Sequence, residues 1–315
     1  MPSRFKLLRR LLTLCAITLL VMQAFTDLWS HLAIDPPASV LSLPWAAVAF
    51  GAMLVSSFWL YTAIPAELGV VVSIAFRMHR TSVVLILCAS YAAGPWAWSL
   101  VRPVTPVQPG SLSVFSANVL YSRADLSRLD AEITRVDPDV LVFQEVDALK
   151  VRRLRAVLGD RYPYWIAEPS QDAFGQATFS RLPFVDEPVT MPEAIVEANG
   201  EVAHIITRVL VDDLVVEIHN THTFPPLGRR FMVHQHRHAR ALTAHKSDAD
   251  AVVLAGDLNS PDRGSILRLL NRDGFISVHA ARGRGPGATW PDPERRSKIT
   301  FLGLRTRIDH VLFTP

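Results

Sequence analysis

Three apolar runs in the first third of the chain constrain the fold most, because each is long enough to cross a lipid bilayer. Residues 11–28 contain one charged residue, Asp27, and residues 44–64 and 82–101 contain none. A helix needs about 20 apolar residues to span a hydrocarbon core about 30 Å thick. The runs therefore predict a membrane domain over residues 1–102, with about three transmembrane helices at these positions.

Basic residues near the ends of the runs predict their orientation. Four Lys or Arg residues precede the first run, the next loop has none, and Arg77 and Arg80 lie between the second and third runs. Because basic loops stay in the cytoplasm, three spans place the N-terminus inside and residues 111–315 outside. The first run could instead be a cleaved signal peptide, although no small-residue cleavage pattern follows it. The nine apolar residues 68–76 could contribute to a fourth span.

Charge and cysteine content separate the two parts of the chain. Residues 1–110 hold seven Lys or Arg and three acidic residues, so the other 205 residues, with 25 basic and 26 acidic side chains, have a net charge of −1. The sequence pI of about 9.1 is therefore no evidence for nucleic-acid binding. Both cysteines, Cys15 and Cys88, lie in apolar runs, which excludes thiolate zinc sites from the second part. Residues 103–110, with three prolines, predict a semi-stiff linker.

From residue 111 onward, short β-rich runs alternate with amphipathic stretches, which predicts an α/β architecture. The expected elements are strands at 111–119, 139–143, 214–222 and 251–256, and helices at 125–136 and 264–270. Polar residues lie at the end of each strand, where α/β enzymes usually hold their active site.

The residue types at these strand ends suit metal-assisted hydrolysis of a phosphoester. Mg²⁺ prefers carboxylate oxygens, which Glu145 supplies. The amides of Asn118 and Asn259 can contact a phosphate without repelling it, and Asp257 can align the attacking water. His222 can donate to the phosphate or protonate a leaving oxygen.

These segments resemble the endonuclease/exonuclease/phosphatase superfamily over residues 111–314. The resemblance rests on Ser-Ala-Asn-Val at 116–119, Phe-Gln-Glu-Val at 143–146, Gly175 with Ser-Arg-Leu-Pro at 180–183, Thr-His at 221–222, Gly-Asp-Leu-Asn-Ser-Pro at 256–261, Ala-Thr-Trp at 288–290 and Arg-Ile-Asp-His at 307–310. An N-terminal membrane-spanning segment joined to such a domain resembles a bacterial subgroup of the superfamily.

The resemblance implies a four-layer α/β sandwich over residues 111–315, in which helices flank two packed β-sheets, and Mg²⁺ or Mn²⁺ as cofactor. By position it implies that Glu145 is the metal ligand and that Asn118 and Asn259 contact the phosphate. It implies four catalytic residues, which are His222, Asp257, Asn259 and Asp309.

One part of the family pattern is missing. Family members continue past the Arg-Ile-Asp strand to a Ser-Asp-His segment and a last strand, whereas this sequence stops at Pro315. We therefore expect a domain without its last strand, either because the protein is longer or because the segment was lost, and an open strand edge. His310 is not expected to replace the missing histidine, because neighbours on one strand, such as Asp309 and His310, point to opposite faces.

A second histidine cluster offers an alternative metal site. His234 and His238 would share a helical face, and His236 lies between them. The same stripe, with Phe231 and Leu242, is ordinary for a packed helix, and nearby arginines would repel a cation. We interpret these histidines as structural or surface residues.

The sequence thus predicts a multi-pass membrane protein whose extracytoplasmic domain hydrolyses a phosphodiester or phosphomonoester with Mg²⁺ or Mn²⁺. The alternative is a catalytically impaired pseudoenzyme, a membrane-tethered domain that binds a phosphate ligand or partner. Lipid headgroups, nucleotides and nucleic acids are all candidate substrates, and the lipid bilayer is the other expected partner. Residues 167–173 and 283–293, the loops expected to select among substrates, carry no readable pattern.

Overall fold

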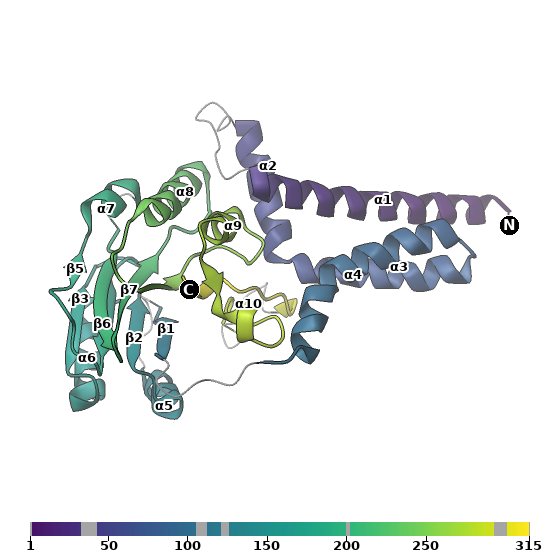
Figure 1. Cartoon of the computed structure of the whole chain (residues 1–315). Helices are drawn as coiled ribbons and strands as arrows, with labels where there is room; N and C mark the ends of the chain where they lie inside the picture. The colour runs from purple at the N-terminus through teal and green to yellow at the C-terminus, as the bar shows by residue number, and fades with distance from the viewer. Residues whose placement is uncertain are drawn as a thin grey trace. The chain divides into compact units, whose positions relative to one another are not determined.

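The protein is described here by a computed structural model that covers residues 2–32, 43–104, 112–120, 126–199, 202–292 and 301–314. Most of the predicted linker, residues 105–110, lies outside these ranges. The chain divides into two units (Figure 1). The first contains residues 1–103, 261–268 and 283–307, and the second contains residues 104–260, 269–282 and 308–315.

Apolar helices make up most of the first unit. They are α1 (Pro2–Leu32), α2 (Leu43–Ser57), the 3₁₀ helix η2 (Trp59–Thr62), α3 (Ala63–Ala75) and α4 (His79–Val101). Two of them, over Phe5–His31 and His79–Val101, are long and apolar enough to cross a membrane. A third crossing results if Val48–Ser57 and Trp59–Ala75, which are bent by 85° relative to each other, count as one span.

The predicted run 44–64 is not one continuous helix. Helix α2 ends at Ser57, and most of the apolar stretch 68–76 belongs to α3. Pro65 explains why a helix begins anew here. Proline has no amide hydrogen for a helical hydrogen bond, which interrupts a helix interior but is tolerated in the first turn, where Pro65 lies in α3.

Small residues line the contacts among α1, α3 and α4. Ala16, Ala66 and Cys88 are buried together with Leu85. Polar pairs join the same helices, including Ser73 Oγ and Ser82 Oγ at 2.7 Å. Small side chains let helix backbones approach closely, which is the usual packing of helices in lipid.

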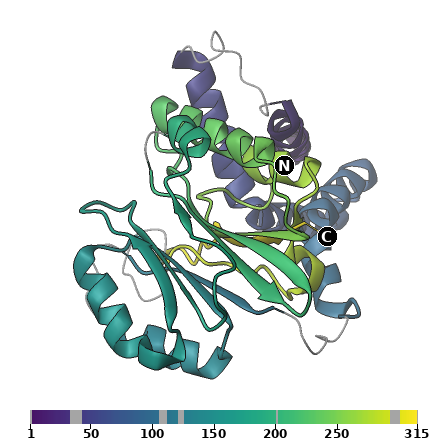
Figure 2. The same cartoon turned by 60° about the vertical axis from the view of Figure 1, so that its left-hand side comes forward.

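Two mixed β-sheets form the centre of the second unit (Figure 2). The first sheet has the order β1 (Val114–Asn118), β2 (Val140–Gln144), β4 (Gln176–Ser180) and β3 (Tyr164–Glu168), with β1 and β2 parallel. The second has the order β5 (Val189–Thr190), β6 (Ile205–Val211), β7 (Leu214–His222), β8 (Ala251–Asp257), β10 (Asp309–Phe313) and β9 (Ile276–Ser277), with β7 and β8 parallel. Strand β10 pairs with β8 along its whole length and with β9 at Leu312 and Phe313.

The remaining helices follow these strands along the chain. They are α5 (Ser127–Val136), α6 (Ala148–Leu158), the 3₁₀ helix η3 (Gly159–Arg161), α7 (Glu193–Asn199), α8 (Arg229–Ala244), α9 (Ser265–Arg272), which is shared between the two units, and α10 (Val278–Arg282).

Alternation along β2 shows how the layers pack. Leu141 and Phe143 share a core with residues of α5 and α6, whereas Val140 and Val142 share a core with residues of β6, β7 and β8. Because successive side chains of a strand point to opposite faces, β2 lies between a helical layer and the second sheet. Helix α8 covers the other face of the second sheet, where Gln235 donates to the Leu258 carbonyl at 3.0 Å. The predicted α/β sandwich of two packed sheets flanked by helices is confirmed.

Strand β7 coincides with the predicted strand 214–222 and presents different chemistry on its two faces. Ile218 joins the core between the sheets, and Asn220 accepts a hydrogen bond from Gln144 Nε2 of β2 at 2.8 Å. Glu217 and His219 lie on the opposite face, toward the residue that follows α8, His245.

Candidate active site

The ends of β1, β2, β7 and β8 place polar side chains in one site. Asn118 is the last residue of β1, Glu145 follows β2, and His222 and Asp257 end β7 and β8. Each of these strands is parallel to one neighbour in its own sheet, so their carboxyl ends lie at a common edge. In β2 and β8, apolar residues fill the strand interior and fix the register, and the polar side chains come at the carboxyl end.

Asn118 connects the two sheets. Its Nδ2 donates to Glu145 Oε1 at 2.8 Å and to Asp257 Oδ2 at 3.1 Å. Its Oδ1 accepts a hydrogen bond from the Leu120 backbone N–H at 2.9 Å, which fixes the orientation of the amide. A single amide donor therefore lies between two carboxylates that repel each other.

Asp257 is buried, with 5% of its surface exposed. Burial, followed by repulsion from Glu145, raises the pKa of Asp257 to about 6, although hydrogen bonds from the Asn259 backbone N–H and from Asn118 act in the opposite direction. A carboxyl with a pKa near neutrality can accept and return a proton under physiological conditions. Its Oδ2 lies 3.8 Å from His222 Nε2.

His222 and Asn259 form the opposite side of the same site. Asn259 Nδ2 donates to the Thr223 carbonyl at 2.9 Å and lies 3.3 Å from His222 Nε2. Burial lowers the pKa of His222, although the charges of Glu145 and Asp309 oppose this shift. The imidazole is therefore neutral at pH 7, and Nε2 can accept from the Asn259 amide.

Asp309 and His310 lie on different faces of β10. Asp309 pairs in register with Asp257 of β8, so both carboxylates lie on the same face of the sheet. His310 is buried and makes a 2.8 Å hydrogen bond to the Ser260 carbonyl through Nε2. The structure thus joins Asp309 to the site and ties His310 to the loop after β8.

Positive φ angles shape the backbone around the site. Glu145 has φ 62° and Asn259 has φ 44°, a conformation that non-glycine residues rarely adopt and that clusters at functional sites. Gly256 has φ 151°, and a Cβ atom there would lie 1.8 Å from the Thr221 carbonyl oxygen. Only glycine allows β7 and β8 to approach this closely one residue before Asp257.

Two contributors were not predicted. The Phe174 ring lies 5.2 Å from the His222 ring and 4.6 Å from that of Phe224, between centroids, and forms an apolar wall. Gln235 donates to the carbonyls of Leu258 and Asn259 at 3.0 and 3.1 Å, and holds the loop that carries Asn259. Gln235 lies within the His234–His238 segment, so its polar character on the buried face of a helix was the available signal.

The histidine segment of α8 is built into the fold. His236 and His238 are buried, and the His234 ring packs against Phe224 with centroids 5.6 Å apart. Within the described ranges, His234, His236 and His238 do not bring their ring nitrogens together as a ligand set. This agrees with a structural interpretation.

The residues at the strand ends fit a hard divalent cation. Glu145 and Asp257 supply oxygen donors, and the repulsion that raises the pKa of Asp257 is what a cation beside Glu145 would relieve. In the described part of the chain, Glu145, Asp257 and Asp309 do not converge as a three-carboxylate cage. Mg²⁺ usually binds through one or two carboxylates and keeps water or phosphate at its other positions, which this arrangement allows.

Comparison with known proteins follows from this geometry. Residues 115–315 match the model of the endonuclease/exonuclease/phosphatase family. The chain belongs to this family. Its members are phosphoester hydrolases and typically depend on a divalent metal ion. No curated protein matches the chain in sequence.

Among similar solved structures, those of TDP2 and NExo, with TM-scores above 0.5, show the same fold. An endonuclease/exonuclease/phosphatase from Beutenbergia cavernae is 24% identical with a TM-score of 0.47, and the alignment covers 65% of this chain and 64% of that one. A humanized D. rerio TDP2 is 16% identical with a TM-score of 0.51, covering 65% and 84%. The 3′ phosphatase NExo from Neisseria, bound to a product DNA hairpin, is 17% identical with a TM-score of 0.52, covering 65% and 87%.

Proposed function

We propose that the second unit hydrolyses a phosphoester bond with Mg²⁺ or Mn²⁺ held by Glu145. The observation that carries this proposal is the position of Asn118. Its amide donates both to Glu145, at the end of the same sheet, and to Asp257, at the end of the other sheet. The three side chains come from three separate strands, and family membership supports phosphoester chemistry at this edge.

Asp257 is the proposed general base. Its pKa of about 6 leaves it ionised at pH 7 yet able to take a proton from water. The Asn259 backbone N–H donates to Asp257 Oδ1 at 2.8 Å and Asn118 donates to Oδ2 at 3.1 Å, and a carboxylate oxygen has a second lone pair with which to accept from water. Asp309 lies beside Asp257 and across from His222, where its negative charge orients the imidazole.

The two amides and His222 are the proposed phosphate contacts. Asn118 and Asn259 are neutral, and each would release one present contact, Asp257 for Asn118 and His222 for Asn259, to donate to a phosphate oxygen without adding negative charge. Once Asn259 turns to the phosphate, the neutral His222 ring can carry its proton on Nε2 and donate it to the phosphate or the leaving oxygen. A bound divalent cation would supply charge neutralisation for the pentacovalent transition state.

Small phosphoesters are the proposed substrates. The Neisseria 3′ phosphatase binds DNA, which makes a nucleic acid one candidate for this chain. Residues 111–315 have a net charge of −1, however, and proteins that bind nucleic acids usually neutralise many phosphates with basic side chains. A lipid headgroup or a nucleotide, which offers only a few negative charges, suits this domain better.

Membrane attachment is a further part of the proposal. The apolar helices α1 and α4, with the bent pair Val48–Ser57 and Trp59–Ala75 as a third span, would anchor the chain, with the basic N-terminus in the cytoplasm and the second unit outside. Alkaline phosphatase fused after Gly110 should be active, and green fluorescent protein at the same position should be dark. The reverse pattern would place the second unit in the cytoplasm.

The activity is tested on the full-length protein in detergent. Bis-p-nitrophenyl phosphate and p-nitrophenyl phosphate report diesterase and monoesterase activity, each with Mg²⁺, Mn²⁺ or EDTA. We expect metal-dependent turnover that falls about 10²- to 10⁴-fold in Asp257→Asn, the usual range for loss of a general base. Asp160→Asn, which removes a carboxylate from η3, is the control and should retain activity. Equal rates in wild type and Asp257→Asn would reject the assignment.

A further inference from the structure

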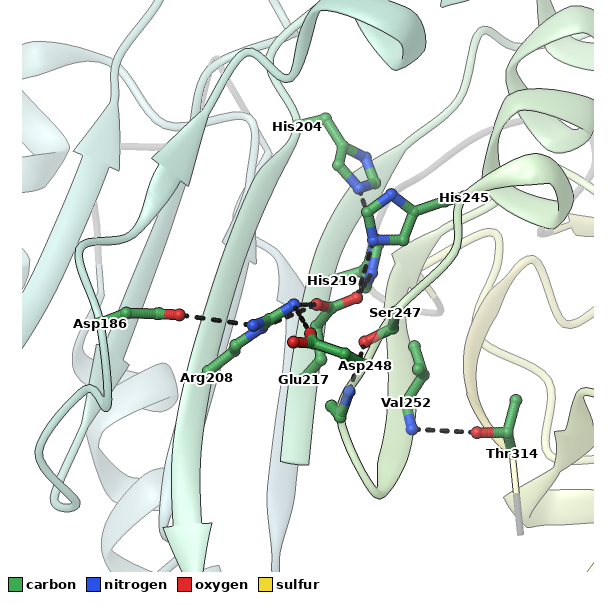
Figure 3. A network of polar contacts seen from close by, with 11 residues as sticks. Asp186, His204, Arg208, Glu217, His219, His245, Ser247, Asp248, Val252 and Thr314 are labelled. Carbon is green, nitrogen blue, oxygen red and sulfur yellow. Dashed lines mark hydrogen bonds and ion pairs between the residues drawn. The ribbon is translucent and has the colours of Figure 1, made fainter. Parts of the chain in front are cut away.

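A second cluster of ligand-type side chains lies on the other face of β7. Glu217, His219 and His245 bring one carboxylate oxygen and two ring nitrogens within 4.8 Å of one another, and they are the single such set in the ranges covered by the structure (Figure 3). We propose that these three residues form a binding site for a transition-metal ion such as Zn²⁺, separate from the site at Glu145. This proposal does not depend on the reaction assigned above.

The three ligands come from positions that the fold fixes. Glu217 and His219 are two residues apart on β7 and so share one face of the strand. His245 is the first residue after α8 and ends the helix. Glu217 and His219 are buried, whereas the His245 side chain is 28% exposed and gives the site access to solvent.

The distances leave room for an ion after a small adjustment. Glu217 Oε1 lies 2.8 Å from His219 Nε2 and 2.9 Å from His245 Nε2. In a tetrahedral zinc site with ligand bonds of about 2.0–2.1 Å, neighbouring ligand atoms are about 3.3 Å apart. An outward movement of about half an ångström therefore opens the two carboxylate-to-imidazole contacts enough for a metal ion. The ion takes the place of the proton on Nε2 of His219 and of His245, and each neutral ring then carries its proton on Nδ1.

The donor types favour a transition metal over Mg²⁺. Two imidazole nitrogens and one carboxylate oxygen match the ligands of zinc sites that keep a fourth position for water. Mg²⁺ instead prefers oxygen ligands, as at Glu145. The two sites of this chain therefore differ in the ion that each selects.

Charges around the cluster leave it able to accept a cation. Arg208 Nε and Nη2 both donate to Glu217 Oε2, at 2.9 and 2.8 Å, so Oε1 remains directed at the histidines. Arg208 is itself paired with Asp248 at 2.7 Å and with Asp186 at 3.5 Å. Three carboxylates against one guanidinium give a net charge of −2, which a divalent ion neutralises.

Buried histidines extend outward from this cluster in a chain. His204 Nε2 lies 2.9 Å from His219 Nδ1, and His204 Nδ1 lies 3.4 Å from His238 Nε2. His204, His219 and His238 are all buried, which disfavours a charged ring, and neutral imidazole is the form that binds metals. Each neutral ring donates through one nitrogen and accepts through the other.

This chain supplies the outer contact that metal-binding histidines need. With metal on His219 Nε2, its proton must be on Nδ1, which then donates to His204 Nε2. His204 in turn donates to His238, which lies 3.5 Å from the Thr221 hydroxyl. Metal binding thereby sets the tautomers of a histidine chain that ends one residue before His222.

Cobalt spectroscopy tests the site in the full-length protein in detergent. The protein is stripped with a chelator and titrated with Co²⁺ in millimolar Mg²⁺, which keeps the oxygen-rich site at Glu145 occupied. We expect one equivalent of Co²⁺ to give visible d–d absorption of a low-coordinate, nitrogen-ligated ion, and Zn²⁺ to displace it. Absence of this absorption would overturn the proposal.

Matched variants locate the ion. His245→Gln is partly exposed and should fold, as circular dichroism can verify, yet it should weaken Co²⁺ binding more than about tenfold, as should Glu217→Gln. His234→Gln, on the same helix but outside the cluster, should bind as wild type does, and so should Glu145→Gln. Wild-type affinity in His245→Gln, or loss of binding in Glu145→Gln, would show that the ion lies elsewhere.

Discussion

Asn118 Nδ2 donates to Asp257 Oδ2 at 3.1 Å, although 139 positions separate the two residues in the chain. The same nitrogen donates to Glu145, so its two protons hold apart two carboxylates that would otherwise face each other directly. This arrangement explains why an amide, and not an acid, is needed at the end of β1.

Asn118→Asp replaces the two hydrogen bonds to Glu145 and Asp257 by charge repulsion. The new carboxylate is nearly the same size but repels Glu145 and Asp257, so in EDTA the free energy of unfolding should fall by about 2 kcal/mol or more. Millimolar Mg²⁺ should restore most of the loss, because the cation neutralises the added charge. Thermal unfolding with and without Mg²⁺ measures both effects. Asn271→Asp, on the exposed part of α9, is the control. An equal loss of stability and an equal rescue by Mg²⁺ in this variant would show that the effect does not come from repulsion by Glu145 and Asp257.

Asp257 makes the stability of the metal-free protein depend on pH. Its folded pKa of about 6 exceeds its usual 3.8, because burial and the charge of Glu145 disfavour ionisation. Between these values the folded state binds more protons than the unfolded state, so stability is lost as pH rises from about 4 to 6. The difference amounts to about 3 kcal/mol at most.

The comparison of wild type with Asp257→Asn isolates this contribution. The unfolding midpoint of wild type in EDTA should decline from pH 4 to pH 7 relative to that of the variant, and Mg²⁺ should flatten the difference. Parallel pH profiles of the two proteins in EDTA would contradict the raised pKa.

Gly256→Ala should be strongly destabilising. The added Cβ would lie 1.8 Å from the Thr221 carbonyl oxygen, and φ of 151° is strained for any residue with a side chain. We expect a loss of about 2–4 kcal/mol in denaturant unfolding. In Gly159→Ala the backbone is also strained, at φ 49° and ψ −136°, but the new Cβ meets nothing within 4 Å, so the loss is only that strain, about 1–3 kcal/mol. Similar losses in both variants would mean that the clash with the Thr221 carbonyl oxygen adds nothing to the backbone strain.

Glu145→Gln should reduce Mg²⁺ affinity more than any other single change at the strand ends. Gln keeps the acceptor for Asn118 but loses the charge that attracts the cation, so calorimetry should show binding weakened by more than about tenfold. His234→Gln should leave Mg²⁺ affinity unchanged. If the two variants lost affinity equally, α8 would contribute to magnesium binding.

Local patterns in the sequence were sufficient for the strands that carry the site. Strand 214–222 and the strand ending near Asp257 follow from β-branched runs bounded by polar residues, which is local information. The break between α2 and α3 was considered only as the condition for a fourth span, because residues 44–64 are uniformly apolar and Pro65 follows them.

Contacts between distant segments set the remaining features. The pairing of Glu217 and His219 with His245 depends on where α8 ends against β7, which no local pattern encodes. Phe174 acts by packing, so its residue type carries no signal of a site, whereas Gln235 was detectable only as a polar residue on a buried helix face. The chemistry of Asp257 was expected from its motif. Its raised pKa could not be predicted, because it depends on burial and on the charge of Glu145, which only the folded structure brings together.

The two faces of β7 have a consequence for how this chain can change. One side carries Asn220 and His222 toward the interior of the sandwich, and the other carries Glu217 and His219 toward α8. A single-residue insertion between Val216 and Glu217 would move Glu217, His219, Asn220 and His222 to the opposite faces and disable both sets of polar contacts in one event. Any evolutionary drift in one set of residues is therefore confined to substitutions that preserve the length of this strand.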